Sequence, residues 1–233
     1  EIFMPFYGDP LHFKEAVQSI LAQSDSDWKL TVVDDVYPDL APGKWLESLG
    51  DQRITYIRNT KNLKPSANYN KCVKLAESDF LVLMGCDDIM LPRYISRVKS
   101  LIEDFPSADV IQPGVSVIDE HGTPQKPLAD RIKGFIAPRS GLPREFSGEP
   151  LEKSLLRGNW TYFPSLVWRR SLISDLVFRE DLNVVQDLMM LLNITESGGT
   201  LVKDLEIVFN YRRHLQSVSG KQGADGRKFA QEF

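Results

Sequence analysis

The segment FLVLMGCDDIMLP, from Phe80 to Pro92, carries the pattern on which the fold prediction rests. An apolar run suited to a buried strand ends in two adjacent carboxylates, Asp87 and Asp88, and a proline that can open a helix follows. The earlier segment KLTVVDD ends in the same way at Asp34 and Asp35. Two core strands that each end in paired aspartates predict a common site beyond the ends of those strands.

Strands and helices alternate around this segment. Apolar periodicity and turn residues predict strands at 2–7, 29–34, 53–58 and 80–84, and helices that begin at Asp9-Pro10, at 43–49, at 66–77 and after Pro92. Parallel strands need long crossover connections and are buried on both faces. The alternation therefore predicts an α/β fold with a doubly wound, mostly parallel sheet flanked by helices.

The pattern becomes less regular after Asp109. Short strands are predicted at 110–112, 115–118, 165–169 and 206–211, and helices at 151–156 and 187–196. The segment 124–148 is rich in Pro, Gly and basic residues, which predicts a long functional loop or lid. We therefore expect a single domain with two halves, residues 1–108 and a smaller, mixed half at 109–233.

Composition excludes several classes of protein. Of the 233 residues 42% are apolar, and the net charge of −4 without a Lys/Arg-rich block argues against a dedicated nucleic-acid binder. No apolar segment reaches the ~18 residues of a membrane span and no secretory leader pattern is present, so we expect a cytoplasmic location. Cys72 and Cys86 match neither a CxxC pair nor a disulfide-rich scaffold and are expected to be reduced thiols.

Three predicted strand ends should meet at one edge of the sheet. A strand order of 3-2-1-4 would bring Pro5-Phe6-Tyr7, Asp34-Asp35 and the segment 85–88 into one cleft, where ligands bind in open α/β sheets. Clustered carboxylates repel one another unless a cation lies among them, and Mg²⁺ or Mn²⁺ takes one or two carboxylates together with phosphate oxygens. The alternative is that these aspartates are solvated caps, since Asp is common at strand ends and helix starts.

The motifs, in this order, resemble glycosyltransferase family 2, whose members adopt the GT-A fold. The resemblance runs from about Phe3 to Ser219 and rests on the segments MPFYGDPLHFKEAVQSILAQSDSDWKLTVVDD, NLKPSANYNKCVKLAESDFLVLMGCDDIMLP, GNWTYFPSLVWRRSLI, VVQDLMMLL and YRRHLQSVS. It implies an inverting, metal-dependent transferase that uses a nucleotide-sugar donor, with a UDP-sugar favoured, in bacterial-type synthesis of cell-surface polysaccharide or glycolipid. The implied acceptor is a glycan or a lipid-linked sugar, at the inner face of the cell membrane.

The resemblance also implies roles for residues on the donor side. Asp87 matches the last aspartate of the family's DxD motif, which binds Mn²⁺ or Mg²⁺, and Gly85 replaces the first aspartate of that motif. Asp88 is expected to orient a ligand or a metal-bound water. Cys86 lies within the motif, although a hard cation prefers oxygen ligands to a soft thiol. Asp35 is expected to contact the nucleotide base, with Pro5, Phe6 and Tyr7 as the opposite wall of the base pocket.

Further roles follow from the second half and from the segment before the metal motif. Asp187 matches the catalytic base, with the plain helix N-cap as the alternative. The resemblance gives His214 a diphosphate or metal contact, with a structural histidine as the alternative. Arg212 and Arg213 could pair with phosphate, and a solvated surface position is the alternative for at least one of them. The remaining candidates are Asn70, for the ligand or for local hydrogen bonds, and Asn159, Trp160 and Tyr162, for the acceptor side or for core packing.

Two other functions stay open from the sequence. A nucleotidyltransferase would need a glycine-rich, lysine-bearing phosphate loop near the first strand, and the sequence lacks one there. A domain that binds a nucleotide sugar or a glycan without turnover is compatible with Gly85 in the metal motif.

Overall fold

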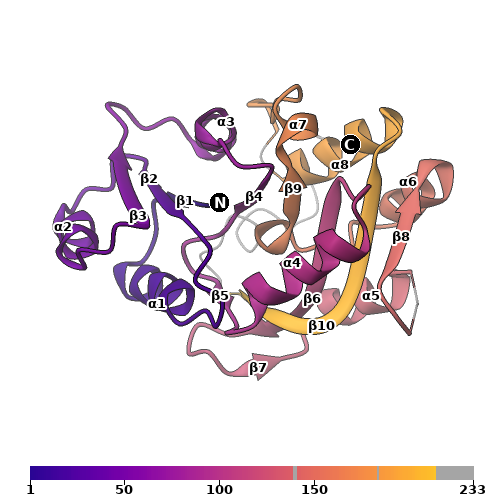
Figure 1. Cartoon of the computed structure of the whole chain (residues 1–233), viewed down its shortest axis with the longest axis horizontal. Coiled ribbons are helices and arrows are strands. Elements are labelled where there is room, and N and C mark those ends of the chain that lie inside the picture. Colours follow the sequence, from indigo (N-terminus) through magenta and orange to yellow (C-terminus); the bar gives the residue numbers. More distant parts are fainter. Residues whose placement is uncertain (139–140, 183, 214–233) are drawn as a thin grey trace.

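The computed structural model of the chain describes residues 1–138, 141–182 and 184–213. Within these ranges one sheet has the strand order β3-β2-β1-β4-β9-β6-β10-β5, with β7 paired to β6 and β8 paired to β10 (Figure 1). The strands are β1 (Ile2–Phe6), β2 (Leu30–Asp34), β3 (Ile54–Arg58), β4 (Phe80–Leu83), β5 (Ile89–Met90), β6 (Val110–Ile118), β7 (Pro124–Gln125), β8 (Arg144–Ser147), β9 (Val167–Arg169) and β10 (Thr200–Arg212).

The predicted order 3-2-1-4 of the first half is confirmed. Strand β1 pairs in parallel with β2 and β4, and β2 pairs in parallel with β3. The register sets Phe6 opposite Asp34, and Asp34 opposite Arg58. The carboxyl ends of these strands therefore lie at one edge of the sheet. Beyond β4 the sheet is mixed, because β9 runs antiparallel between β4 and β6, an insertion that the sequence pattern did not predict.

Helices cover both faces of the sheet (Figure 1). They are α1 (Pro10–Leu21), α2 (Ala41–Ser48), α3 (Pro65–Leu75), α4 (Tyr94–Asp104), α5 (Leu128–Ile136), α6 (Gly148–Leu156), α7 (Arg170–Ile173) and α8 (Gln186–Glu196), with a 3-10 turn η1 (Phe163–Ser165). Apolar residues of α1, α2 and α4 share one core cluster with alternate strand residues, and those of α3, α6 and α8 share the other. In the described ranges no helix is long and apolar enough to cross a membrane.

Two strand predictions in the second half were wrong. Residues 110–118 form the single strand β6 rather than two short strands. The break suggested by Pro113-Gly114 is instead the place where the register between β6 and β10 shifts. A side chain at Gly114 would collide with the backbone of Leu205 and Glu206, so glycine permits this close approach. Strand β10 also begins at Thr200, earlier than predicted, because charged residues interrupt its apolar alternation.

The prediction of a long loop or lid at 124–148 was wrong as well. The segment contains β7, helix α5 and β8. Proline and glycine flank α5 and obscure its short helical pattern in the sequence. Strand β8 pairs antiparallel with β10, from Thr200 opposite Ser147 to Lys203 opposite Arg144. The segment is therefore built into the second half of the sheet.

Candidate active site

The first aspartate after β2 is held by the protein itself. Asp34 is buried, and its carboxylate accepts hydrogen bonds from the backbone N–H of Tyr37, from the Tyr56 hydroxyl and from Arg58 Nη1, the last at 2.6 Å. Burial, and then the hydrogen bond to Asp34, raise the pKa of Tyr56 to about 12. Asp34 is thus a neutralised structural carboxylate, which differs from the expected cluster of unneutralised charges.

Asp35 anchors the loop that leads to α3. Its Oδ1 accepts from Asn59 Nδ2 (2.8 Å) and from the backbone N–H of Leu63 (2.7 Å), and its Oδ2 accepts from the N–H of Lys64 (3.0 Å). Val36 and Lys64, which flank this contact, both have positive φ, 65° and 72°. Such strain in non-glycine residues concentrates at functional sites. The expected contact between Asp35 and a nucleotide base remains a prediction.

The three residues at the end of β1 have different environments. Phe6 is buried and packs against Phe13 and Tyr37, with ring centroids 4.3 and 5.0 Å away, so it is a core residue. Pro5 is half-buried in the strand. Tyr7 is 56% exposed and meets Tyr37 edge to face at 5.8 Å. Of the predicted wall, Tyr7 offers an accessible ring, and Tyr37, which stands where the family usually has a small residue, lies beside it.

In the pair after β4, the buried Asp88 carboxylate is less well satisfied by the protein than the carboxylates after β2. Asp87 is half-buried, whereas Asp88 is buried at 1% exposure. Asp88 Oδ1 accepts the backbone N–H of Arg212 (2.8 Å), but Asp88 Oδ2 has no hydrogen-bond donor among the described residues. Burial, and then the charge of Asp87, raise the pKa of Asp88 well above its usual range. A buried carboxylate with an unpaired oxygen beside a second carboxylate favours the approach of a cation.

Gly85 has a steric role in this loop. A Cβ at position 85 would collide with Asp88 Oδ2 and would lie 3.0 Å from Asp87 Oδ1. The Asp88 carboxyl group therefore fills the space into which a side chain at position 85 would project. Glycine at position 85, where the DxD motif has aspartate, therefore makes room for the buried carboxyl group of Asp88.

Cys86 connects the ends of β4 and β1. A Cβ on Gly8 would lie 2.8 Å from Cys86 Sγ, so the thiol packs directly against the β1 loop. Burial, and then the charge of Asp87, raise the pKa of the thiol, against a smaller lowering by a backbone hydrogen bond from Tyr7. A protonated thiol is a poor ligand for Mg²⁺ or Mn²⁺. We interpret Cys86 as a packing residue of the motif.

The residues at this edge fit a hard divalent cation that takes most of its ligands from elsewhere. Among the described residues, no three His, Cys, Asp or Glu side chains lie close enough to form a protein cage. Asp87, with Asp88 Oδ2 behind it, offers one or two carboxylate oxygens. Mg²⁺ and Mn²⁺ are bound in this way when substrate phosphates and water complete the octahedron. His214, the other predicted ligand, lies outside the described residues.

Arg212 holds the Asp87-Asp88 loop in place. It is buried, and its Nε donates to the Asp87 carbonyl oxygen (2.6 Å), its Nη2 to Glu15 Oε2 (2.6 Å) and its Nη1 to the Glu120 carbonyl oxygen (3.0 Å). The guanidinium is thus surrounded by protein acceptors, which favours a positioning role. The contact of Arg212 with a phosphate stays a prediction. The hydrogen bonds to protein acceptors argue against it, because they already occupy the guanidinium.

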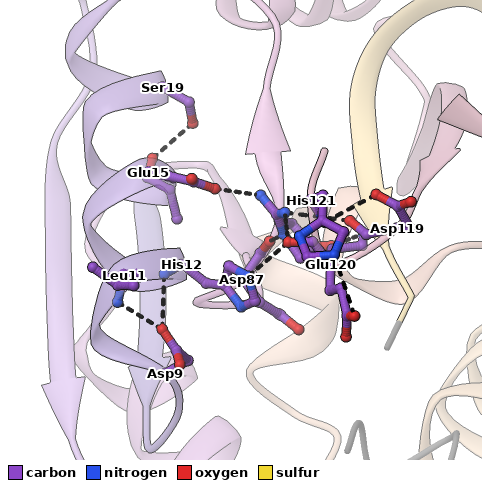
Figure 2. Close-up of polar contacts among 12 residues, drawn as sticks. Asp9, Leu11, His12, Glu15, Ser19, Asp87, Asp119, Glu120 and His121 are labelled. Atoms are coloured by element: carbon purple, nitrogen blue, oxygen red, sulfur yellow. Dashed lines mark hydrogen bonds and ion pairs between the residues drawn. The ribbon is translucent and has the colours of Figure 1, made fainter. Parts of the chain in front are cut away.

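Helix α1 and the turn after β6 meet beside the same loop. Glu15 and His12 project from α1 toward Glu120, and Asp87 lies next to them (Figure 2). His12 Nε2 donates to the Glu120 carbonyl oxygen at 3.0 Å. Arg213 turns away and pairs with Asp130 of α5, with Nε 2.7 Å from Oδ2. Arg212 therefore links α1 and the turn after β6 to the Asp87-Asp88 loop, whereas Arg213 links the end of β10 to α5.

Asparagines in and near α3 make side-chain hydrogen bonds, and of these only Asn70 was predicted as a site residue. Asn70 exchanges two hydrogen bonds with the backbone of Phe178, at 2.9 and 2.8 Å, which matches the local alternative stated for it. Asn59 donates to Asp35 and accepts from Lys71 Nζ (2.6 Å). Asn59 directly follows β3, so its place at the same sheet edge as Asp35 was available from the sequence and was overlooked.

Asp187 lies in the first turn of α8 and faces a buried polar environment. It is half-buried, and its Oδ2 accepts from Asn159 Nδ2 (2.8 Å). Asn159 is itself fixed, because its Oδ1 accepts from the Thr161 backbone N–H (3.1 Å) and hydroxyl (2.7 Å). Burial raises the pKa of Asp187, and the positive charge of Lys133 opposes that shift. A raised pKa brings a carboxylate closer to the range in which general bases act.

Tyr69 relates the carboxylates of the two halves. It packs edge to face on Phe163, with ring centroids 5.0 Å apart. Burial raises the pKa of its hydroxyl most, and nearby ionisable groups, Asp87 and Asp187 among them, raise it further by smaller amounts. The charges of Asp87 and Asp187 thus both act on this phenol, although the two residues belong to different halves of the chain. The sequence separates them by a hundred residues.

The predicted acceptor-side residues have three different roles in the structure. Asn159 contacts Asp187, as described above. Trp160 is buried and donates from Nε1 to Ser154 Oγ (3.1 Å), which is core packing. The Tyr162 hydroxyl donates to Asp130 Oδ1 (3.1 Å), and the ring of Tyr162 lies under Lys133 Nζ at 4.7 Å. Lys133 was not a predicted site residue, since nothing local distinguishes it from other lysines.

One curated protein is similar in sequence to most of this chain. An uncharacterized glycosyltransferase of Methanocaldococcus jannaschii, MJ1057, is 25% identical over 189 residues, which are 80% of this chain and 61% of the relative. The chain therefore spans less than two thirds of that protein.

Two solved structures share the fold. Staphylococcus aureus TarS 1–349, in complex with UDP-GlcNAc, superposes with a TM-score of 0.70 at 16% identity and covers 91% of this chain and 58% of its own. The mannosyltransferase PcManGT of Pyrobaculum calidifontis, in complex with GDP-Man and Mn²⁺, superposes with a TM-score of 0.71 at 14% identity and covers 99% and 63%. At such low identity these likenesses establish the fold, which is the GT-A fold.

A family model gives the family itself. The model described as Glycosyl transferase family 2 matches residues 1–168, which include the aspartate pairs after β2 and β4. The match covers well over half of the chain and agrees with the strand order and with the aspartates at the strand ends. The chain belongs to glycosyltransferase family 2, a family of transferase enzymes.

Proposed function

We propose that the chain is a metal-dependent, inverting glycosyltransferase that moves a sugar from a nucleotide-diphosphate donor to an acceptor hydroxyl, with a UDP-sugar as the favoured donor. Family membership supports sugar transfer. The fold relatives with UDP-GlcNAc, and with GDP-Man and Mn²⁺, support a nucleotide sugar and a divalent cation. The observation that carries the proposal is the pair of carboxylate oxygens beside Gly85, Asp87 Oδ1 and Asp88 Oδ2, the latter without a donor among the described residues, since such a pair suits the divalent cation of a nucleotide diphosphate.

The donor side consists of the strand ends of residues 1–108. The Asp35 loop and the exposed ring of Tyr7 would hold the nucleoside, and Asp87 would hold the cation that binds the diphosphate. When bound, Mg²⁺ or Mn²⁺ would stabilise the charge of the departing diphosphate. Arg212 keeps the Asp87-Asp88 loop at a fixed position for that contact.

Asp187 supplies the base on the acceptor side. An acceptor hydroxyl is a poor nucleophile until its proton is removed during attack on the anomeric carbon. The Asp187 carboxylate would take that proton, while Asn159 holds its Oδ2 in one orientation. Displacement in a single step inverts the anomeric carbon and needs no covalent enzyme intermediate. The acceptor would be a glycan or lipid-linked sugar in surface polysaccharide or glycolipid synthesis, and a cytoplasmic location stays part of this proposal.

The test measures nucleotide release that depends on Asp187. Wild-type protein is given a panel of UDP- and GDP-sugars with Mn²⁺, and candidate mono-, oligosaccharide and lipid-extract acceptors. The release of the free nucleotide is then recorded. Asp187→Asn should lower release by about 10² to 10⁴-fold and keep the thermal stabilisation by donor and Mn²⁺. Asp175→Asn, which removes an exposed carboxylate from the same half, should release nucleotide at the wild-type rate.

Two results would contradict the proposal. Near-normal release by Asp187→Asn would remove the base assignment. Donor binding by the wild type without release for any acceptor of the panel would favour a nucleotide-sugar-binding domain without turnover, the function that Gly85 leaves open.

A further inference from the structure

A cleft of about 370 Å³ lies between α5, β6 and β10. Its lining includes Lys133 and Asp130 from α5, Lys203 and Asp204 from β10, and the aromatic side chains of Trp160 and Tyr162. The cleft adjoins the Asp187 site, since Trp160 follows Asn159 in the chain and the charge of Asp187 acts on Lys133. No function described so far uses its charged residues.

The two lysines of the cleft have neutral partners. Lys133 Nζ donates to the Thr161 carbonyl oxygen (2.7 Å), and Lys203 Nζ donates to the Pro138 carbonyl oxygen (2.7 Å). Neither lysine has a carboxylate oxygen within 4.0 Å among the described residues. Burial lowers the pKa of both amines, and no nearby charge contributes to the shift of Lys203. Each ammonium therefore keeps hydrogen-bonding capacity for a further acceptor.

The two carboxylates of the cleft are already neutralised from outside it. Asp130 accepts two hydrogen bonds from Arg213, at 2.7 and 3.0 Å. Asp204 accepts two from Arg97, also a bidentate pair, at 2.7 and 2.8 Å. Arginine pairs of this kind are the strong ones in proteins. The excess charge of the lining is therefore positive and comes from Lys133 and Lys203.

We propose that this cleft binds an anionic group, a phosphate ester or a carboxylate, of the acceptor, with Lys203 and Lys133 as its ligands. The inference rests on the proposed function in one respect, because it takes the molecule in the cleft to be the acceptor whose hydroxyl meets Asp187. Lys133 lies between the cleft and Asp187. The anionic group would therefore be separated from the reacting hydroxyl by no more than one sugar or polyol unit. A neutral acceptor would leave the half-buried ammonium groups of Lys203 and Lys133 without an anionic ligand in the cleft.

The test compares charged and neutral probes when the donor site is filled. Binding of glycerol 3-phosphate and of glucuronate is measured by calorimetry in saturating UDP and Mg²⁺, with glycerol and glucose as their neutral counterparts. Wild-type protein should bind at least one anionic probe at least about tenfold more tightly than its neutral counterpart, which corresponds to one charge-assisted hydrogen bond. The probe that binds identifies phosphate or carboxylate as the group. Equal binding of both pairs would overturn the proposal.

Variants assign the effect to the cleft. Lys203→Met should weaken binding of the anionic probe by about tenfold or more, Lys203→Arg should restore most of it, and Lys133→Met should weaken it as well. Lys74→Met, which removes an exposed lysine of α3, should bind as the wild type does. If Lys203→Met and Lys133→Met keep wild-type affinity, the anion binds elsewhere and the proposal is wrong.

The outcome separates this site from the proposed function. Lys203→Met should keep the thermal stabilisation by donor and Mn²⁺, because no lining residue of the cleft belongs to residues 1–108. Lysine-dependent anion binding without any nucleotide release would retain the anion site and remove glycosyl transfer. Nucleotide release with neutral acceptors, together with no preference for the anionic probes in binding, would retain glycosyl transfer and remove the anion site.

Discussion

The aspartate pairs after β2 and β4 occupy equivalent places in the sheet and have opposite surroundings. The Asp34 and Asp35 carboxylates accept six hydrogen bonds from backbone and side-chain donors, including one from Arg58. Asp88, in the second pair, has one backbone donor for Oδ1 and none for Oδ2 among the described residues. A motif of two aspartates therefore does not by itself identify a cation site.

The two pairs differ in how many hydrogen-bond donors the protein supplies to their carboxylates. A carboxylate that already accepts several hydrogen bonds is stable as an anion without a metal. A buried carboxylate that lacks them beside a like charge is costly, and a divalent cation removes the cost. We infer that Asp34 is structural and that Asp35 shapes the loop that would hold the nucleoside, whereas the pair after β4 would bind the cation.

The largest effect on stability is expected at the pair after β2. Asp34→Asn should lower the free energy of unfolding by about 3 kcal/mol, because it removes the buried negative charge that accepts hydrogen bonds from the half-buried Tyr56 hydroxyl and Arg58 guanidinium. Urea unfolding followed by circular dichroism measures this loss. A change below about 0.5 kcal/mol would show that Asp34 is not the structural carboxylate of the comparison. Asp39→Asn, at an exposed position of the same loop, serves as the control.

A second effect is expected at Gly85. Gly85→Ala should lower the free energy of unfolding by about 2 kcal/mol, because the added methyl group meets the Asp88 carboxyl group. In the Asp88→Ala background the same substitution should cost much less, since the obstructing group is absent. The double-mutant cycle, from four urea unfolding curves, measures this coupling. Additive effects would mean that Asp88 does not fill the space at position 85.

The smallest effect concerns the charge of Asp88. Its pKa is higher in the folded than in the unfolded protein, so the folded state is favoured while Asp88 is protonated and loses that advantage as pH rises through the raised pKa. Asp88→Asn removes this loss. The variant should match the wild type near pH 4 and become increasingly more stable than it at higher pH, in unfolding measured without metal. A difference that shrinks as pH rises would contradict the raised pKa.

The first half of the fold was predictable because its signals are local. Apolar runs of strand length, Asp9-Pro10 and Pro92 mark the elements of residues 1–104, and their alternation implies parallel order. The second half depends on distant contacts. Strand β10 carries Lys203 and Asp204 in its middle, where Arg97 of α4 neutralises the carboxylate, and no local pattern reveals that pairing.

The positions of the site residues were easier to predict than their partners. Asp35, Asp87 and Asp187 lie where the motifs put them, after β2, after β4 and at the start of α8. That Arg58 neutralises Asp34 follows from the register of β2 and β3, and that Arg212 supports Asp87-Asp88 follows from tertiary packing. Neither can be read from one segment. The roles of Asp35, Asp87 and Asp187 in binding and catalysis stay predictions.

The measurement that tests the central claim most directly is Mn²⁺-dependent nucleotide binding by variants of the two pairs. The electron paramagnetic resonance signal of free Mn²⁺ and the shift in melting temperature are recorded with UDP for the wild type, Asp87→Asn, Asp34→Asn and the exposed control Asp27→Asn. At a hundredfold excess over Kd, binding stabilises the wild type by about 2.7 kcal/mol. We predict that Asp87→Asn leaves the signal of free Mn²⁺ undiminished and shows no shift in melting temperature, with its metal-free stability intact. Folded Asp34→Asn and Asp27→Asn should lower that signal and raise the melting temperature as the wild type does. Mn²⁺ bound normally by Asp87→Asn would contradict the account.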